Sequence, residues 1–284
     1  MRISEINNGN MNKIYLVEIE DKKYIVRTSD FNNEFECKVL ELLKGTNFNC
    51  PQIITHFELN GKYIMLYEYL EGDNPKTFDD NFFIGLAEQL KKLHSIDAKY
   101  QKEEYISNEE NLEKLKSYYE KALKSSYLKD NIEFVKILYN EIQNINLEVF
   151  KKCIVHSDLK KENMIQNESD LFLIDFGNCY YGNRLIDVIR IIMWFFIKEH
   201  NYDYRKIKVF ITNYLCNNPL TEEEKKNIDL LIEYCILYNL LKDISLNEDG
   251  ILTNYYIENN SLNWLDELKE KEKIMRIGEL FKNA

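Results

Sequence analysis

The sequence lacks any long apolar run. Its longest candidate for a membrane span, Ile191–Ile197, has seven residues, far short of the roughly 20 that a transmembrane helix needs. The first ten residues also lack the positive-then-apolar pattern of a secretory signal. These two absences predict a cytoplasmic protein without a membrane partner.

Paired cysteines and a surplus of positive charge are also missing. The six cysteines show no CxxC spacing, which indicates reduced, mostly buried thiols rather than a disulfide framework or a zinc site. The formal net charge of −11 argues against a nucleic-acid partner, because a phosphate backbone needs a basic surface. A negative surplus is compatible with a cationic substrate.

What the chain does contain is enough apolar material for a sizeable core. Its 284 residues are 45% hydrophobic and 30% charged, which suits one large or two small domains.

One polar stretch, Ile154–Phe176, carries the chemistry of the chain. Its sequence IVHSDLKKENMIQNESDLFLIDF places Asp158 and Asn163 after one apolar β-like run, and Asp175 at the end of another. Phosphoryl transfer from a Mg-nucleotide needs one carboxylate to orient the attacking hydroxyl, and an amide and a second carboxylate to hold the metal. The alternative, a polar turn between two core strands, accounts for a histidine-aspartate pair but not for the joint pattern.

The motifs HSDLKKEN and IDFG resemble the catalytic and metal loops of the protein-kinase-like superfamily, especially its small-molecule branch of aminoglycoside phosphotransferases and choline kinases. The resemblance implies an α+β, two-lobe protein-kinase-like fold, with an antiparallel sheet and one helix in the N-lobe and a largely helical C-lobe. It implies that Asp158 is the catalytic base and that Asn163 and Asp175 ligate Mg²⁺. Lys160 would neutralise charge on the transferred phosphate; the alternative is a solvent-exposed lysine.

Two further residues are implied to support these loops. His156 would do so by packing and hydrogen bonding rather than by proton transfer. Asp187 resembles the second, structural acid of the family, which helps to fix the catalytic loop.

The first 67 residues predict a small antiparallel sheet that carries one helix. Asp21-Lys22 and Asn60-Gly61 are the expected hairpin turns. The expected strands are 14–20, 23–28, 56–59 and 62–67, and the expected helix is 32–44.

The run INNGNMNKIYLV places Gly9 and Asn12 between the strand-like start of the chain and the expected strand 14–20, and it resembles the nucleotide-positioning loop of the small-molecule kinases. Gly9 and Asn12 match that loop, whereas Asn8 and Met11 stand where the family has a glycine and a serine or threonine. A plain hairpin is the alternative. The GxGxxG loop of protein kinases is absent.

The rest of the implied nucleotide site lies at two strand ends. Arg27 stands where the superfamily usually has lysine and choline kinases often have arginine; it would contact the phosphates and pair with Glu36, unless the two form only a surface ion pair. The carbonyl of Glu68 and the amide of Leu70 would contact the adenine. We therefore assign residues 1–70 to a nucleotide-binding lobe, with the linker at about 67–75.

Residues 71–284 predict a helical lobe with the catalytic loop, the metal loop and the acceptor site. Capping boxes at Ser107–Glu110 and Thr221–Glu224 would start two helices. Trp194 is expected in the core, with a cation-binding aromatic wall as the alternative. The segment after Asp175 is too short for an activation loop, which disfavours a protein kinase. The expected helices are 82–94, 107–123, 131–142, 221–241 and 261–281.

We therefore predict an ATP-dependent kinase, aminoglycoside-phosphotransferase-like, that moves the γ-phosphate to a hydroxyl of a small cationic molecule. Mg²⁺ is the expected cofactor and ATP the co-substrate, with GTP left open. One alternative is a choline/ethanolamine kinase-like enzyme, and another is a catalytically silent nucleotide-binding scaffold. The acceptor stays open among aminoglycosides, choline, ethanolamine, homoserine and sugars, and the oligomeric state between monomer and homodimer.

Overall fold

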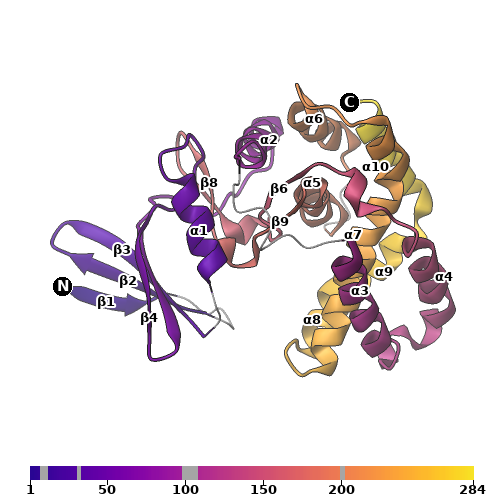
Figure 1. The fold of residues 1–284 in the computed structure, drawn as a ribbon, viewed down its shortest axis with the longest axis horizontal. Coiled ribbons are helices and arrows are strands. Elements are labelled where there is room, and N and C mark those ends of the chain that lie inside the picture. The colour runs from indigo at the N-terminus through magenta and orange to yellow at the C-terminus, as the bar shows by residue number, and fades with distance from the viewer. Residues whose placement is uncertain (7–11, 31–32, 98–107, 199–201) are drawn as a thin grey trace.

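The computed structural model describes residues 1–6, 12–30, 33–97, 108–198 and 202–284. Figure 1 shows an N-terminal sheet on one side, a group of helices on the other, and short strands between them. The sheet is antiparallel with the strand order β1-β2-β3-β5-β4. Its strands are β1 (Arg2–Glu5), β2 (Asn12–Ile19), β3 (Lys22–Ser29), β4 (Ile53–Leu59) and β5 (Lys62–Glu68).

The two predicted hairpins are both present, but one turn is displaced by a residue. Ile19 pairs with Lys22, so the first turn consists of Glu20 and Asp21 rather than Asp21 and Lys22. The strand ladder decides this register, because Lys22 is needed as the partner of Ile19. The second turn is Asn60-Gly61 as predicted, and both residues have positive φ, which is the type I′ geometry.

The single helix of this part, α1 (Glu34–Leu43), lies against the sheet as predicted. Its apolar stripe buries Cys37, Val39, Leu40 and Leu43. Its first turn also buries Glu36, whose charge therefore needs a partner inside the protein.

The second part of the chain is largely helical. The helix predicted to end near residue 241 continues to 248, because Ile244 and Ser245 are still buried. The single helix predicted for 261–281 is interrupted at Glu270, and no glycine or proline marks this break in the sequence. The helices are α2 (Asp80–His94), α3 (Asn108–Ala122), α4 (Ile132–Ile142), α5 (Leu185–Ile192), α6 (Tyr204–Leu215), α7 (Glu222–Glu248), α8 (Asn254–Tyr256), α9 (Leu262–Lys269) and α10 (Lys271–Lys282).

Capping explains where several of these helices begin. Asp79 accepts a hydrogen bond from the amide of Phe82 at the start of α2. The predicted box of Thr221 and Glu224 is present in both directions at the start of α7. The other predicted box includes Ser107, which lies outside the described residues, as does Gly9 of the expected nucleotide loop.

Two short antiparallel pairs position the polar stretch between the two parts. They are β6 (Lys152–Val155) with β9 (Tyr180–Asn183), and β7 (Met164–Gln166) with β8 (Leu171–Leu173). The loop between β6 and β7 and the loop between β8 and β9 therefore emerge side by side.

A connecting segment, residues 69–79, joins β5 to α2. Asp73 forms an isolated bridge with Gln166 of β7, with N to O distances of 3.1 and 2.8 Å. The α+β arrangement of a sheet with one helix followed by helices agrees with the prediction. None of the helices in the described ranges is both long and apolar enough to cross a lipid bilayer.

Candidate active site

The loop after β6 holds Asp158 in a fixed position. Its Oδ2 accepts hydrogen bonds from Lys160 Nζ at 3.0 Å and from Asn163 Nδ2 at 2.9 Å. The same Nδ2 donates to the main-chain carbonyl of Asp158 at 2.8 Å. Within the described part of the chain, Oδ1 of Asp158 accepts no side-chain hydrogen bond, and the side chain is 21% exposed. That oxygen is therefore free to accept a proton from a bound molecule.

A buried carboxylate beneath this loop fixes its backbone. Asp187 of α5 accepts hydrogen bonds from the amides of His156 and Ser157 at 2.8 and 2.7 Å. It also lies 3.1 Å from Nε2 of His94, whose Nδ1 lies 2.8 Å from the hydroxyl of Tyr214. Burial by itself raises the pKa of Asp187, but the hydrogen bonds and charges of His94 and His156 lower it below its ordinary value. His94, at the end of α2, therefore belongs to this support.

His156 joins the two loops. Its Nε2 donates to the carbonyl of Ile174 at 3.0 Å, and its Nδ1 accepts the amide of Asp158 at 3.4 Å. The ring is fully buried and lies 4.5 Å from the ring of Phe176. Because each ring nitrogen has a partner inside the protein, His156 supports the loops and is not free to exchange protons with a ligand.

Backbone strain marks both loops. Ser157 and Asp175 have φ values of 65° and 64°, in a region that residues with a side chain adopt at a cost of about 1–3 kcal/mol. Ser157 is held there by its hydroxyl, which donates to the carbonyl of Asn178 at 2.7 Å.

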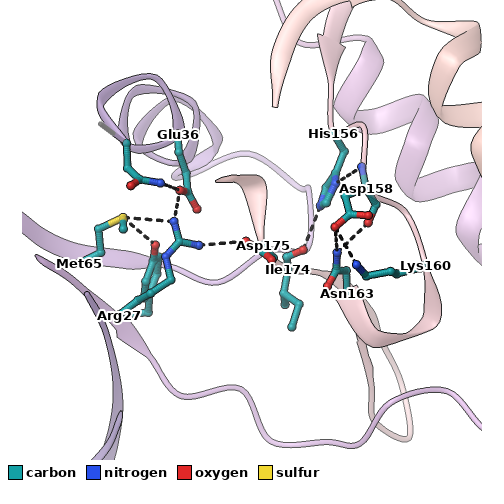
Figure 2. A network of polar contacts seen from close by, with 11 residues as sticks. Arg27, Glu36, Met65, His156, Asp158, Lys160, Asn163, Ile174 and Asp175 are labelled. Atoms are coloured by element: carbon teal, nitrogen blue, oxygen red, sulfur yellow. Dashed lines mark hydrogen bonds and ion pairs between the residues drawn. The ribbon is translucent and has the colours of Figure 1, made fainter. Parts of the chain in front are cut away.

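Arg27 links the sheet to the second loop, as Figure 2 shows. Its Nη1 donates to Asp175 Oδ1 at 3.0 Å, and its Nη2 donates to Glu36 on α1. Glu36 also accepts from Nδ2 of Asn33 at 2.7 Å. Although burial by itself lowers the pKa of Arg27, the negative charges around it raise it, so the side chain stays cationic. The pairing of Arg27 with Glu36 is the one that the sequence predicts.

These contacts produce two clusters next to each other. Figure 2 shows Arg27, Glu36 and Asp175 on one side and Asp158, Lys160 and Asn163 on the other, with Ile174 between them. The carboxylate of Asp175 is 41% exposed, so it is open to a ligand despite its ion pair.

The oxygen atoms in these clusters suit Mg²⁺. Both hydrogen bonds of the Asn163 side chain use its Nδ2, so its Oδ1 is not engaged by them. Over the described ranges, no group of three or more histidine, cysteine or acidic side chains forms a metal cage. Mg²⁺ takes oxygen ligands and usually only one or two protein carboxylates, so Asn163 and Asp175 fit this metal better than they fit zinc.

The other predicted nucleotide residues lie near the same sheet. Asn12 begins β2, and its buried Oδ1 has no partner in the part of the chain that the structure describes. Glu68 ends β5, and Leu70 follows in the connecting segment. The contacts of these residues with a nucleotide stay predictions.

A cavity of about 440 Å³ opens beside the catalytic loop. Trp194, expected in the core, instead lines this cavity, while Phe196 is buried as expected. Lys198 Nζ lies 4.3 Å from the ring centre of Trp194, and Trp264 meets the same ring edge to face. The cavity is lined by Phe78, Phe83, Lys160, Lys161, Glu162, Trp194, Phe195, Phe196, Lys198 and Lys206.

Sequence reasoning missed several charged residues near this site, among them Arg190 on α5 and Lys242 on α7. Burial and the charge of Arg190 lower the pKa of Lys242, whereas Asp243 and Asp158 raise it, so that the net shift is downward. The available signal was a lone charge inside an apolar helical run, as in LIDVIRIIM. Asp243 lies near Lys242, whereas Asp249, at the end of the same helix, pairs with Lys121 at the surface.

Comparison with known proteins shows which family this chain matches. Residues 2–211 match the model of a family described as the phosphotransferase enzyme family. A curated relative, the LicA homolog of Mycoplasma capricolum, is 25% identical over 213 residues, which cover 74% of this chain and 78% of that protein. Hydroxylysine kinase of Xenopus laevis is 27% identical over 158 residues, which cover 52% of this chain and 41% of that protein.

A solved structure shares the fold. The spectinomycin phosphotransferase structure with ADP and spectinomycin superposes with a TM-score of 0.68 at 15% identity, covering 98% of this chain and 93% of that chain. At this identity the likeness shows the fold alone, and it confirms the prediction of a two-lobe protein-kinase-like fold. The family match confirms the predicted class of enzyme, a small-molecule kinase.

Proposed function

Because this chain belongs to the phosphotransferase enzyme family, we propose that it transfers the γ-phosphate of ATP to a hydroxyl of a small, amine-bearing acceptor at Asp158. The observation that carries this proposal is the Asp158 carboxylate, held by Lys160 and Asn163 with one oxygen free. It lies beside the cluster of Arg27, Glu36 and Asp175 (Figure 2).

We assign each residue one task. Asp158 orients the acceptor hydroxyl and accepts its proton, and Lys160 neutralises charge on the transferred group. Asn163 and Asp175 hold Mg²⁺, which when bound neutralises charge on the phosphate oxygens. His156 and Asp187 keep the loop in place.

The nucleotide lies, in this proposal, against the N-terminal lobe of residues 1–70. Arg27, anchored by Glu36, contacts the phosphates. The main chain at Glu68 and Leu70 contacts the adenine, with GTP open as a second nucleotide, and Gly9 and Asn12 complete the site.

An amine-bearing acceptor is supported by the net charge of −11 and by the names of the relatives, since spectinomycin and hydroxylysine both carry amines and hydroxyls. The choline/ethanolamine kinase-like alternative is disfavoured by Lys198, which covers the Trp194 ring face that a quaternary ammonium would need. Free cysteines among the described residues and the need for ATP support a cytoplasmic location.

A protein substrate is disfavoured by the short segment after the metal loop. Only the strand β9 and its flanking residues separate Asp175 from α5, which begins at Leu185. A protein kinase needs an activation loop there.

Replacement of the base tests the proposal and its silent-scaffold alternative. Asp158→Asn is expected to lower kcat by about 100-fold or more, because general-base catalysis contributes on that order, while Mg-ATP affinity stays within about twofold. Coupled-enzyme turnover over a panel of amino alcohols, amino acids and aminoglycosides measures the first quantity, and titration calorimetry the second. Glu168→Gln, an exposed change in the β7–β8 turn, is the control. Similar turnover in Asp158→Asn and the parent would refute the assignment of the base.

A further inference from the structure

Two cations near the candidate base have no hydrogen-bond or ion-pair partner among the residues that the structure describes. Arg190 lies one turn after Asp187 on α5, and Lys242 lies on α7. Both side chains are partly exposed, and over the described ranges neither takes part in a hydrogen bond or an ion pair. The Nε of Arg190 is buried without a partner. A partly buried, unpaired cation is unfavourable unless a ligand supplies the counter-charge.

The two cations face the same space as the catalytic loop. Helices α5 and α7 pack against each other. The charges of Arg190 and Asp158 both act on Lys242, which places Lys242 within electrostatic reach of both side chains. Burial raises the pKa of Tyr256 on α8, and the charges of Asp243 and Asp158 raise it further, so Tyr256 also lies within electrostatic reach of Asp158.

The acid closest in sequence to Lys242 does not neutralise this pair. Asp243 accepts a hydrogen bond from Ser261 Oγ at 2.8 Å and forms no ion pair with either cation within the part of the chain that the structure describes. Burial raises the pKa of Asp243, against the opposing effects of Ser261, Lys242 and Arg190. Asp243 therefore lies near both cations without being bonded to either of them.

The charged side chains that line the neighbouring cavity are also mainly positive. Its walls carry four lysines and one acid, Glu162. Lys198 in that wall also acts on Asp243, so the cavity and the two cations border each other. A volume of about 440 Å³ admits a compact molecule. A polycationic acceptor requires an acidic pocket, whereas the charged residues that line the cavity beside Asp158 are mainly lysines.

We propose that Arg190 and Lys242 bind a carboxylate of the acceptor, so that the acceptor is a hydroxylated amino acid. The proposal rests on the proposed function, since it names the substrate class of the same site. A guanidinium and an ammonium that converge on one carboxylate give charge-assisted hydrogen bonds, for which the planar fork of arginine is well suited. The carboxylate of Asp243, which lies near both cations, would pair with the amine of such an acceptor.

Matched acceptors with and without the carboxylate test this. Homoserine is compared with 3-aminopropan-1-ol, hydroxylysine with its decarboxylated diamine, and serine with ethanolamine; each pair shares the hydroxyl and the amine. For at least one pair the parent protein is expected to show a kcat/KM about 10-fold or more higher for the carboxylate member, since hydrogen bonds between charged groups have that worth.

Two substitutions assign the effect to the cations. Arg190→Gln and Lys242→Met are expected to raise the KM of the preferred carboxylate acceptor by about 10-fold or more, with a much smaller change for its partner that lacks the carboxylate. Lys226→Met is the control, because Lys226 lies on the same helix as Lys242, is exposed and forms an ion pair with Glu223. Equal losses on both members of the pair would overturn the proposal, because they would indicate a structural role.

A binding measurement separates this proposal from the proposed function. Calorimetry with Mg²⁺ and a non-hydrolysable ATP analogue reports acceptor binding without turnover. If binding is selective for the carboxylate and Arg190→Gln abolishes it, the carboxylate site is supported even when no phosphate is transferred. The absence of phosphate transfer would then refute only the kinase assignment. Phosphorylation of ethanolamine or choline in preference to every amino acid would overturn the carboxylate site and leave the kinase assignment standing.

Discussion

At the scale of single residues, the site is built from charges that are buried in pairs. Arg27 bridges Glu36 and Asp175, and Asp187 collects two main-chain amides and His94. Removing one partner from such a group leaves the other charge or donor without compensation, which costs more than the pair contributes when intact. The positions of these residues are therefore sensitive to single substitutions even where the substituted residue touches no ligand.

Asp187→Asn tests this at the buried support of the loop. The variant is expected to lose about 2–4 kcal/mol of unfolding free energy near neutral pH, because an amide would point N–H groups at backbone donors. The depressed pKa of Asp187 stabilises the parent above the ordinary aspartate value of 3.8, and this contribution disappears as the pH falls through the lower folded value. Urea unfolding of both proteins from pH 7 to pH 3 measures the difference. It should stay constant down to about pH 5 and shrink below the ordinary value; a gap that widens in acid would contradict the argument.

At the scale of elements, short segments hold the loops against each other. The connecting segment turns at Gly72, which has φ of 145° and bonds through its neighbour Asp73 to Gln166 of β7. A β-carbon at Gly72 would lie 2.6 Å from the carbonyl oxygen of Gln166 and 2.8 Å from Cγ2 of Ile165. Both the backbone angle and the space therefore require glycine at this position.

Alanine substitution at two glycines measures this requirement. Gly72→Ala is expected to destabilise the protein by about 2 kcal/mol or more, because the strand β7 must move or the backbone must strain. Gly85→Ala is the matched control: Gly85 lies within α2, and a β-carbon there would meet no atom within 4 Å, so this change should stabilise the protein by roughly 0.5–1 kcal/mol. Thermal unfolding of the two variants gives the comparison. Equal stabilities would show that the connecting segment adapts freely.

At the scale of the whole molecule, the sheet and the helical part meet at the metal loop. Phe48 packs on Phe176 edge to face at 6.1 Å, and the carbonyl of Asn49 accepts the amide of Leu173 at 3.1 Å. The ion pair of Arg27 with Asp175 joins the same two parts. A ligand that contacts both parts therefore stabilises the fold as a unit.

Metal-dependent stabilisation by the nucleotide follows. A ligand at about 100 times its Kd adds about 2.7 kcal/mol, so Mg-ATP should raise the melting temperature by about 5 °C or more. Chelation of Mg²⁺ with EDTA should remove most of this rise. In Asp175→Asn the rise should no longer depend on Mg²⁺, with Glu168→Gln as the control. An unchanged Mg²⁺ titration of the melting temperature in Asp175→Asn would count against its place as a metal ligand.

The sequence by itself determined the parts whose signals are local. The Asn60-Gly61 turn and the Thr221–Glu224 box depend on neighbours a few residues apart, and both appear as predicted. The Arg27–Glu36 pair was also accessible, but only through the resemblance to a family, because nine residues and a change of element separate its members.

Only the tertiary structure decided what surrounds the polar stretch. The displaced first turn, the break at Glu270 and the longer α7 follow from strand register and helix packing, which act between distant segments. Arg190 and Lys242 lie 52 positions apart in the numbering and become neighbours only because α5 packs against α7. Local patterns identify the polar loops of the candidate site, whereas the charge around them is a sum over side chains from separate helices, which only the packing of those helices brings together.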